Sequence, residues 1–233
     1  MKGRTKYTIF PSEYMAVKTH YTRLARYYFN DDKAVNSLIE FCEGLRLPLT
    51  PGYVSERYPI NQKILNAMFR VGLESLGWNI ESTNNRIVPK ETNKKLNQEG
   101  DFNRVLSNGI RVFGEIEFGN IASAWRDLFK FNLVISFDTF DTGIFILPTE
   151  KISSEIEGCY SYEKVVNIIT SASSSINCPL LIIGLDPDRD LDVDTRDLEP
   201  DYGNDHDGWK SQSNTFWDEF AGRHSEVLLP SIS

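Results

Sequence analysis

Three acidic residues and their spacing are the features of this sequence most able to do chemistry. Glu115 and Glu117 lie two residues apart in the apolar run RVFGEIEFGN, residues 111–120. On a β-strand, residues two apart point to the same side with Cα atoms ~6.6 Å apart, so both carboxylates would reach one volume. The opposite, apolar face of such a strand would carry Val112, Gly114, Ile116 and Phe118.

A third carboxylate, Asp101, lies fourteen residues before Glu115. The pair Asn108-Gly109 between them is typical of a tight hairpin turn, and pairing about that turn would place position 101 near position 116 or 117. Three neighbouring carboxylates repel one another, and a Mg²⁺ ion would relieve that repulsion through its preference for oxygen ligands. The residues therefore indicate either a metal site for phosphate chemistry or a charged strand face in contact with solvent.

The pattern around these residues predicts the elements that must position them. Apolar residues at helical spacing predict helices over 12–29, 31–46, 60–77, 121–134 and 161–175. Apolar runs predict strands over 78–82, 102–106, 110–118, 143–148 and 179–185. Asp31 or Asp32 is predicted to cap the second helix, Gly77 to end the third and Asn120 to cap the fourth. This order of elements predicts an α/β fold with a mixed central sheet flanked by helices.

Length and composition favour an ordinary globular protein. The 233 residues suit a single domain, with a helical N-terminal part (1–58), a core (60–187) and an acidic C-terminal part (188–233). No apolar run approaches the ~20 residues of a membrane span, and the N-terminus lacks a signal-peptide core. The three cysteines fit neither a disulfide framework nor a zinc site. We therefore expect a cytoplasmic protein in a reducing environment, without a membrane partner.

The net charge of −8 is unevenly distributed along the chain. Residues 186–226 hold 13 acidic and 4 basic residues, whereas the first 30 residues hold six basic residues and one acidic residue. A surface that faces nucleic acid is compatible with this distribution if the acidic segment points elsewhere. The sequence contains no glycine-rich phosphate loop, so we expect no organic cofactor.

The order D-x13-E-x-E followed by a helix resembles the PD-(D/E)xK nuclease core. The segments EIEFGN, RDLFKFNL, GIFILPT and PLLIIGL, in this order, resemble more specifically the BglII/BstYI group of type II restriction endonucleases, near relatives of BamHI. This resemblance covers about residues 60–187 and implies a PD-(D/E)xK restriction-endonuclease-like core. It also implies a Mg²⁺-dependent site-specific deoxyribonuclease that cuts both strands of a short palindromic double-stranded DNA site, within a restriction–modification system.

The resemblance gives each residue of the acidic cluster a role. Asp101 and Glu115 match the family's metal-binding acids, and the backbone carbonyl of Ile116 matches a ligand to the same Mg²⁺ ion. Glu117 lies where most PD-(D/E)xK nucleases have lysine, although the BamHI-like version has glutamate there and the BglII-like version glutamine. We expect Glu117 to act as the general base or to position the attacking water, and a second metal ion is the alternative.

Residues that follow the catalytic strand are expected to face DNA. Asn120 either contacts a base or serves only as a helix cap. Ser123, Arg126 and Lys130 continue along the same helix. Arg126 could contact DNA, form a salt bridge or cross a dimer interface. The helices 121–134 and 161–175 resemble those that form the family's dimer contact, so we expect a homodimer that matches a palindromic site.

Two other functions remain compatible with the sequence. One is an inactive nuclease relative that only binds DNA or a protein, since Glu117 replaces the usual lysine. The other is a repair or structure-specific nuclease on the same core. The recognition sequence and the cut position cannot be derived from the sequence, because base contacts come from loops and helix ends.

Overall fold

The structure is a computed structural model that describes residues 6–7, 16–30, 32–51, 55, 57–81, 85–87, 98–186, 192–199 and 211–230. A six-stranded sheet forms the centre of this described part of the chain. Its strands are, in spatial order, β1 (Lys6–Tyr7), β2 (Ala16–Tyr21), β7 (Leu180–Asp186), β6 (Thr142–Pro148), β5 (Arg111–Ile116) and β4 (Phe102–Val105). Strands β5, β6 and β7 run parallel, whereas β1, β2 and β4 pair antiparallel with their neighbours. The predicted mixed sheet is confirmed.

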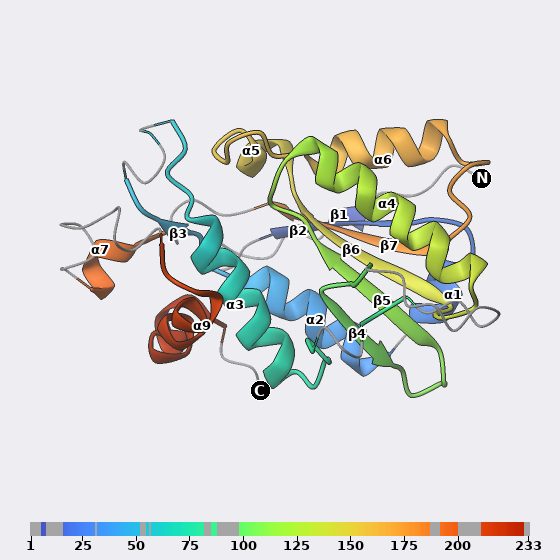
Figure 1. Ribbon diagram of the computed structural model, residues 1–233, viewed down its shortest axis with the longest axis horizontal. Coiled ribbons are helices and arrows are strands. Elements are labelled where there is room, and N and C mark those ends of the chain that lie inside the picture. Colours follow the sequence, from blue (N-terminus) through green and yellow to red (C-terminus); the bar gives the residue numbers. More distant parts are fainter. Residues whose placement is uncertain are drawn as a thin grey trace.

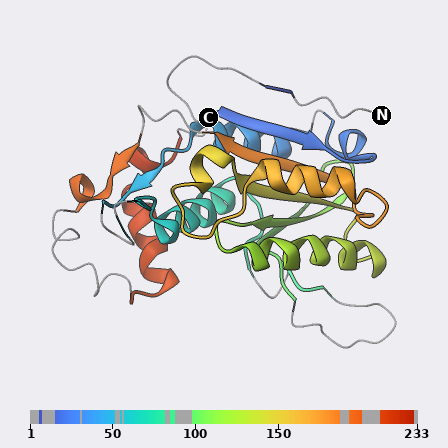
Figure 2. The same ribbon diagram turned by 90° about the horizontal axis from the view of Figure 1, so that it is seen from above.

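Helices cover both faces of the sheet (Figure 1). One face packs against α4 (Ile121–Ser136) and α6 (Tyr162–Ser171), and the other against α2 (Lys33–Gly44) and α3 (Gln62–Ser75). Figure 2 shows α4 and α6 side by side along the sheet. Each face has its own buried apolar cluster. Val112 of β5 belongs to the cluster under α3 and Phe113 to the cluster under α4, so β5 has the alternating faces that the sequence predicts.

Shorter elements complete the fold. They are α1 (Ala25–Phe29), β3 (Pro48–Leu49), α5 (Glu150–Ser153), β8 (Val193–Asp194), α7 (Thr195–Leu198), α9 (Asn214–Arg223) and α10 (Ser225–Leu228). Helix α9 adds Trp217 and Phe220 to the core beside α3, so the acidic C-terminal part contributes to the same core. Residues 187–191 and 200–210 of the acidic run lie outside the described residues. No helix in the described part of the chain could span a membrane.

Local sequence signals set the ends of the main helices. Asp32 caps α2 by accepting hydrogen bonds from the backbone N–H groups of Ala34 and Val35, at 2.9 and 3.4 Å. Gly77 follows α3 with φ +76°, a conformation that glycine adopts without steric strain. Four predicted helices and two predicted strands are confirmed with shifted ends: α2, α3, α4, α6, β6 and β7. The alternative cap, Asp31, lies outside the described residues.

The predicted helix over residues 12–29 is wrong at residues 16–21, and its residues 12–15 lie outside the described residues. Ala16–Tyr21 forms β2, which pairs with β7 from Ala16↔Asp186 to Tyr21↔Leu181, and only Ala25–Phe29 is helical. Val17 and Tyr21 fit a helical spacing and an alternating spacing equally well, and the segment is rich in residues that favour strands. Pairing with the otherwise open edge of β7 decides between the two. The N-terminal part (1–58) is therefore not purely helical, and it supplies a strand of the central sheet.

The β4–β5 hairpin is confirmed, but its register differs from the prediction by one residue. Phe102 pairs with Gly114, which places Asp101 opposite Glu115 and not opposite 116 or 117. The N–H of Leu106 donates to the Ile110 carbonyl at 2.9 Å and closes a loop over residues 107–109, in which Gly109 has φ +83°. This loop has one residue more than a two-residue Asn-Gly turn, and the extra residue shifts the pairing. The strand predicted at 78–82 reduces to an isolated bridge between Asn79 and Asn103, and residue 82 lies outside the described residues.

Candidate active site

The acidic residues gather where β5 ends beside helix α4. Glu115 and Glu117 lie on the α4 side of the sheet and are only 2% and 7% exposed. Asp101 is fixed against β5 by two hydrogen bonds. Its N–H donates to the Gly114 carbonyl at 2.9 Å, and its Oδ2 accepts from the N–H of Ile116 at 2.7 Å. The hairpin therefore holds Asp101 directly beside Glu115.

Burial and mutual repulsion oppose the ionisation of this carboxylate pair. Burial, and then the negative charges of Asp101 and Asp127, raise the pKa of Glu115 well above its usual range. Burial also raises the pKa of Asp101, and the hydrogen bond from the Ile116 N–H and the charge of Lys130 oppose this increase. Carboxyl groups with such raised pKa values are common at functional sites. A cation bound between them would favour their ionised forms.

Glu117 is turned away from this pair. Its Oε1 accepts a hydrogen bond from the N–H of Gly119, two residues further along. A Cβ atom at position 119 would lie 2.6 Å from that oxygen, so glycine is needed for this arrangement. Burial, and then the charge of Asp127, raise the pKa of Glu117 to about 7. Glu117 therefore shares the face of Glu115 but interacts mainly with Asp127.

Two members of the cluster, Asp127 and Lys130, come from helix α4, and the sequence analysis missed their role. Lys130 Nζ donates to Glu115 Oε1 at 2.9 Å. It also lies 3.0 Å from Asp127 Oδ1, in an ion pair whose geometry is not that of a hydrogen bond. Burial alone lowers the pKa of Lys130, but Glu115 and Asp127 raise it above its usual value.

Lys130 continues along α4 after Ser123 and Arg126, but its side chain is buried against β5 and does not face solvent. A sequence signal for this existed. Asp127 and Lys130 fall on the same side of the helix as the buried residues Ala124, Phe131 and Val134. Charged residues on the apolar side of a helix are rarely buried unless they are paired.

Two of the three predicted carboxylates, Asp101 and Glu115, are placed where they could bind a metal ion together, and Glu117 is not. Among the described residues, no group of three or more Asp, Glu, His and Cys side chains is arranged to hold a metal ion. The predicted set of three carboxylates is therefore not assembled, because Glu117 is directed to Gly119 and Asp127. Asp101 and Glu115 remain as an adjacent pair of hard oxygen donors. Such a pair suits Mg²⁺, which often takes only one or two carboxylates and completes its shell with water and phosphate oxygens.

A comparison with protein families matches residues 17–185 to the family described as Restriction endonuclease BglII/BglIII. The chain belongs to this family. It is accordingly a type II restriction endonuclease, a metal-dependent enzyme that hydrolyses double-stranded DNA. The match runs from β2 to β7 and includes the whole acidic cluster. A search of curated proteins gave no match.

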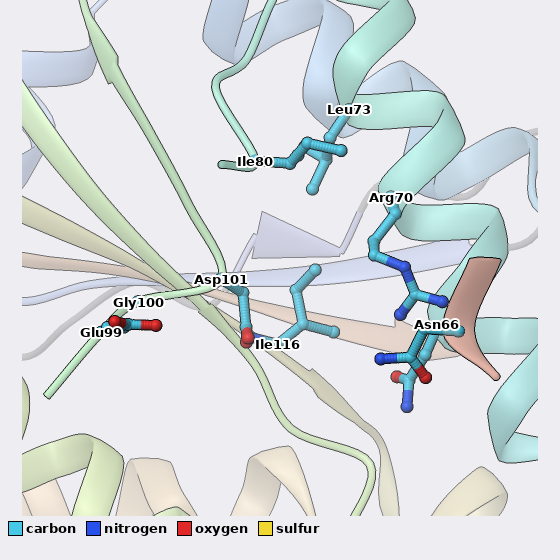
Figure 3. A pocket seen from close by; sticks show the side chains of 9 residues that line it. Asn66, Arg70, Leu73, Ile80, Glu99, Gly100, Asp101 and Ile116 are labelled. Carbon is cyan, nitrogen blue, oxygen red and sulfur yellow. The ribbon is translucent and has the colours of Figure 1, made fainter. Parts of the chain in front are cut away.

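A pocket of about 430 Å³ opens beside Asp101 in this BglII/BglIII family member. Figure 3 shows Asn66 and Arg70 of α3 on one side of it, and Asp101 and Ile116 on the other. The Arg70 guanidinium forms an ion pair with Asp218 of α9 at 2.6 Å. The pocket therefore lies on the α3 side of Asp101, whereas Glu115 faces α4. Glu74 of α3 is exposed and does not line this pocket, so it adds no acid to it.

The residues predicted to face DNA lie on the first turns of α4, next to the acidic cluster. Asn120 is exposed and caps the helix, with its Oδ1 accepting from the N–H of Ser123 at 3.2 Å. The Arg126 side chain is exposed, and its Nε lies 3.6 Å from Asp127 Oδ1. A helix N-terminus also attracts phosphate groups through its free N–H groups. The cap role of Asn120 is confirmed, and the DNA contacts of Asn120, Ser123 and Arg126 stay predictions.

Proposed function

We propose that this restriction endonuclease cuts both strands of a short palindromic DNA site, as a homodimer with Mg²⁺ as its cofactor, within a restriction–modification system. The observation that carries the proposal is the carboxylate pair Asp101–Glu115, held side by side at the end of β5 in a chain whose family hydrolyses DNA. The strand that carries the pair leads through Glu117 and Gly119 to the exposed start of α4, where a DNA backbone would have access.

The acidic cluster divides into groups with different tasks in this proposal. Asp101, Glu115 and the Ile116 carbonyl would hold the Mg²⁺ ion. When bound, the ion supplies Lewis acidity to the scissile phosphate and acidity to a coordinated water. Glu117 would accept a proton from the attacking water or orient it. Its pKa of about 7 suits a base that works near neutral pH.

The first turns of α4 would contact the substrate. Asn120 uses its Oδ1 for the helix cap, and its amide N–H₂ group can still donate to a base edge or a phosphate. Ser123 and Arg126 follow on the next turns, and the exposed guanidinium of Arg126 can reach a phosphate oxygen. These contacts would place the scissile phosphate over the carboxylate pair.

An apolar stripe on α4 supports the homodimer. Ile121, Trp125 and Phe129 recur every four residues and are 49%, 50% and 60% exposed. Residues at this spacing lie on one side of a helix, and a contiguous exposed apolar surface is typical of an interface. The end of α4 is tied to the segment after α6, where Asn132 donates to the Ser175 carbonyl at 3.0 Å. A second copy that packs against this stripe would use the helices predicted to form the dimer.

The dimer can be tested by sedimentation or light scattering. The wild-type protein should have the mass of a dimer, and Trp125→Glu should give a folded monomer because it places a charge in the apolar contact. Tyr27→Glu is a matched control, since Tyr27 is 78% exposed but lies on α1, away from this stripe. A monomeric wild-type protein would contradict the proposed assembly.

The activity is tested by incubating the protein with unmethylated plasmid and phage DNA in Mg²⁺. Discrete fragments are expected, and sequencing their ends would give the recognition site and the cut position. Tight binding in Ca²⁺ without cleavage in Mg²⁺ would replace the proposal with that of an inactive DNA-binding relative. Cleavage that follows DNA shape and ignores sequence would indicate a structure-specific nuclease.

A further inference from the structure

Lys130 has the surroundings of a counter-ion built into the nuclease site. Its ammonium group contacts two carboxylates at once, Glu115 at 2.9 Å and Asp127 at 3.0 Å. The Lys130 side chain is 9% exposed, and the side chains of both partners are 2% exposed. A lysine is rarely buried to this degree unless it compensates charge.

The carboxylates at this place outnumber the lysine that contacts them. Asp101 and Glu117 lie beside the two partners of Lys130 and feel the charge of Asp127. The ammonium thus contacts two of four neighbouring carboxyl groups: Asp101, Glu115, Glu117 and Asp127. Most of the negative charge is left for a further cation.

The position of Lys130 decides how many further cations the cluster can take. The ammonium uses one lone pair of Glu115 Oε1, so Oε2 is the more available oxygen of this residue, which lies beside Asp101. On its other side the ammonium occupies the space between Glu115 and Asp127. A metal ion in that space would face a positive charge in a buried setting, where repulsion between cations is strong.

We propose that Lys130 takes the place of a second metal ion, so that each protomer binds a single divalent cation, at Asp101 and Glu115. Lys130 acts as a positioning residue: it holds Glu115 and Asp127 apart and in place before the metal ion arrives. This inference rests on the proposed metal site. It adds the number of metal ions at that site, and it names Lys130 as the residue that keeps the site folded without metal.

Calcium binding to the intact protein without DNA tests the stoichiometry. Calorimetric titration with CaCl₂ should give one ion per protomer for the wild-type protein and two for Lys130→Met, in which the vacated space can hold an ion. Lys130→Arg keeps the positive charge and should again give one. Two ions per wild-type protomer, or one ion for Lys130→Met, would overturn the proposal.

Thermal unfolding provides a second readout that needs no cleavage. In EDTA, Lys130→Met should melt at least ~6 °C below the wild-type protein, because buried carboxylates lose their counter-ion. Adding Ca²⁺ should restore most of this loss, since a divalent ion can replace the ammonium. If Ca²⁺ does not restore the melting temperature of Lys130→Met, the divalent ion does not replace the lysine and the proposal fails.

Arg111→Met is the matched control for both measurements. Arg111 is also an ion-paired cation on β5, but it lies at the opposite end of the strand. Substitution of Arg111 should leave the Ca²⁺ stoichiometry at one, and Ca²⁺ should not restore the stability that the variant loses.

A wild-type protein that binds one Ca²⁺ but cuts no DNA in Mg²⁺ would refute the proposed activity alone. A wild-type protein that cuts DNA but binds two Ca²⁺ ions would refute the role of Lys130 alone.

Discussion

The two ends of strand β5 carry two ion-pair clusters of opposite character. At its start, Arg111 binds Asp138 at 2.8 Å and Asp141 at 2.7 Å, just beyond the end of α4. These three side chains are 34%, 63% and 30% exposed, respectively. At the end of the strand, Glu115 binds Lys130 of the same helix at 2.9 Å, with both groups buried. Strand β5 thus forms one cluster with the loop after α4, in contact with solvent, and one with α4 itself, in the protein interior.

The direction of the pKa shifts separates a structural contact from a functional one. Hydrogen bonds from Arg111 lower the pKa of Asp141, so the fold favours its ionised form. Burial raises the pKa values of Glu115 and Glu117, so the fold disfavours the ionised forms of these two side chains. The exposed cluster is stabilised as it stands, whereas the buried one, in which a single lysine contacts two carboxylates, would gain stability from an additional cation. An electrostatically unfavourable cluster that is nevertheless built into the fold is characteristic of an active site.

Glu115→Gln should have the largest effect on function. It also removes one of the two carboxylates that contact Lys130, but Asp127 remains as the other. The substitution removes a metal-binding charge, and we expect DNA cleavage to fall by more than ~10³-fold while the fold persists. Cleavage of a plasmid in Mg²⁺ and the melting temperature are the two measurements. Glu40→Gln, an exposed glutamate on α2, is the control and should cut as the wild-type protein does. Undiminished cleavage by Glu115→Gln would remove Glu115 from the site.

Lys130→Met and Arg111→Met compare the two clusters directly in stability. Breaking a buried pair should lower the free energy of unfolding by about 3–5 kcal/mol, whereas the exposed cluster should lose roughly 1 kcal/mol. Urea denaturation in EDTA measures both values. Equal losses would mean that burial does not distinguish the two ends of β5.

Asn120→Ser addresses the start of α4, beside the buried cluster. Serine keeps the helix cap, so stability should change little, but it loses the amide that could contact DNA. We expect site-specific cleavage to fall by an amount equivalent to about 1–3 kcal/mol, as for one lost base contact. Asn120→Ala separates the roles, because it removes both the cap and the contact. Unchanged cleavage by the serine variant would leave Asn120 as a cap alone.

The smallest effect is expected for Asp141→Asn, and it should depend on pH. Because the folded pKa of Asp141 lies below its ordinary value of 3.8, its ionised form stabilises the protein above that pH. The variant should be less stable than the wild-type protein by roughly 0.5–1 kcal/mol at pH 7. This difference should disappear as the pH falls below 3.8 and through the folded pKa. A difference that persists in strong acid would show that Asp141 acts through packing and not through charge.

Sequence patterns predicted the structure correctly where the signal lies within a few neighbouring residues. The caps at Asp32 and Asn120 and the hairpin at Asn108-Gly109 are signals within a few residues, and each is confirmed. The pairing of Asp101 with the strand of Glu115 followed from that hairpin. The exact register of the hairpin did not follow from it. The Asn-Gly dipeptide does not reveal that the loop has one additional residue, and that residue shifts every pair.

Residues 16–21 and helix α4 show where the patterns fail. The segment Ala16–Tyr21 has spacing compatible with a helix, and it becomes a strand because β7 offers an edge. Lys130 lies one helical turn after the exposed Arg126, but on the side of α4 that carries the buried Phe131 and Val134. It turns inward because Glu115 and Asp127 lie within reach of its ammonium group. Strand β7 and Glu115 are remote in sequence from these two segments, so no local pattern identifies them as partners.

The sequence by itself determined that Glu115 and Glu117 leave β5 on one side, because alternation along a strand is a property of the backbone. It also determined the apolar opposite face and the helix that begins at Asn120. Only the tertiary structure decided that the two glutamates have different neighbours. Glu115 meets Asp101 and Lys130, and Glu117 meets Gly119 and Asp127. The reason is physical: electrostatic interactions between side chains depend on distance in space, and the packing of α4 on the sheet sets those distances.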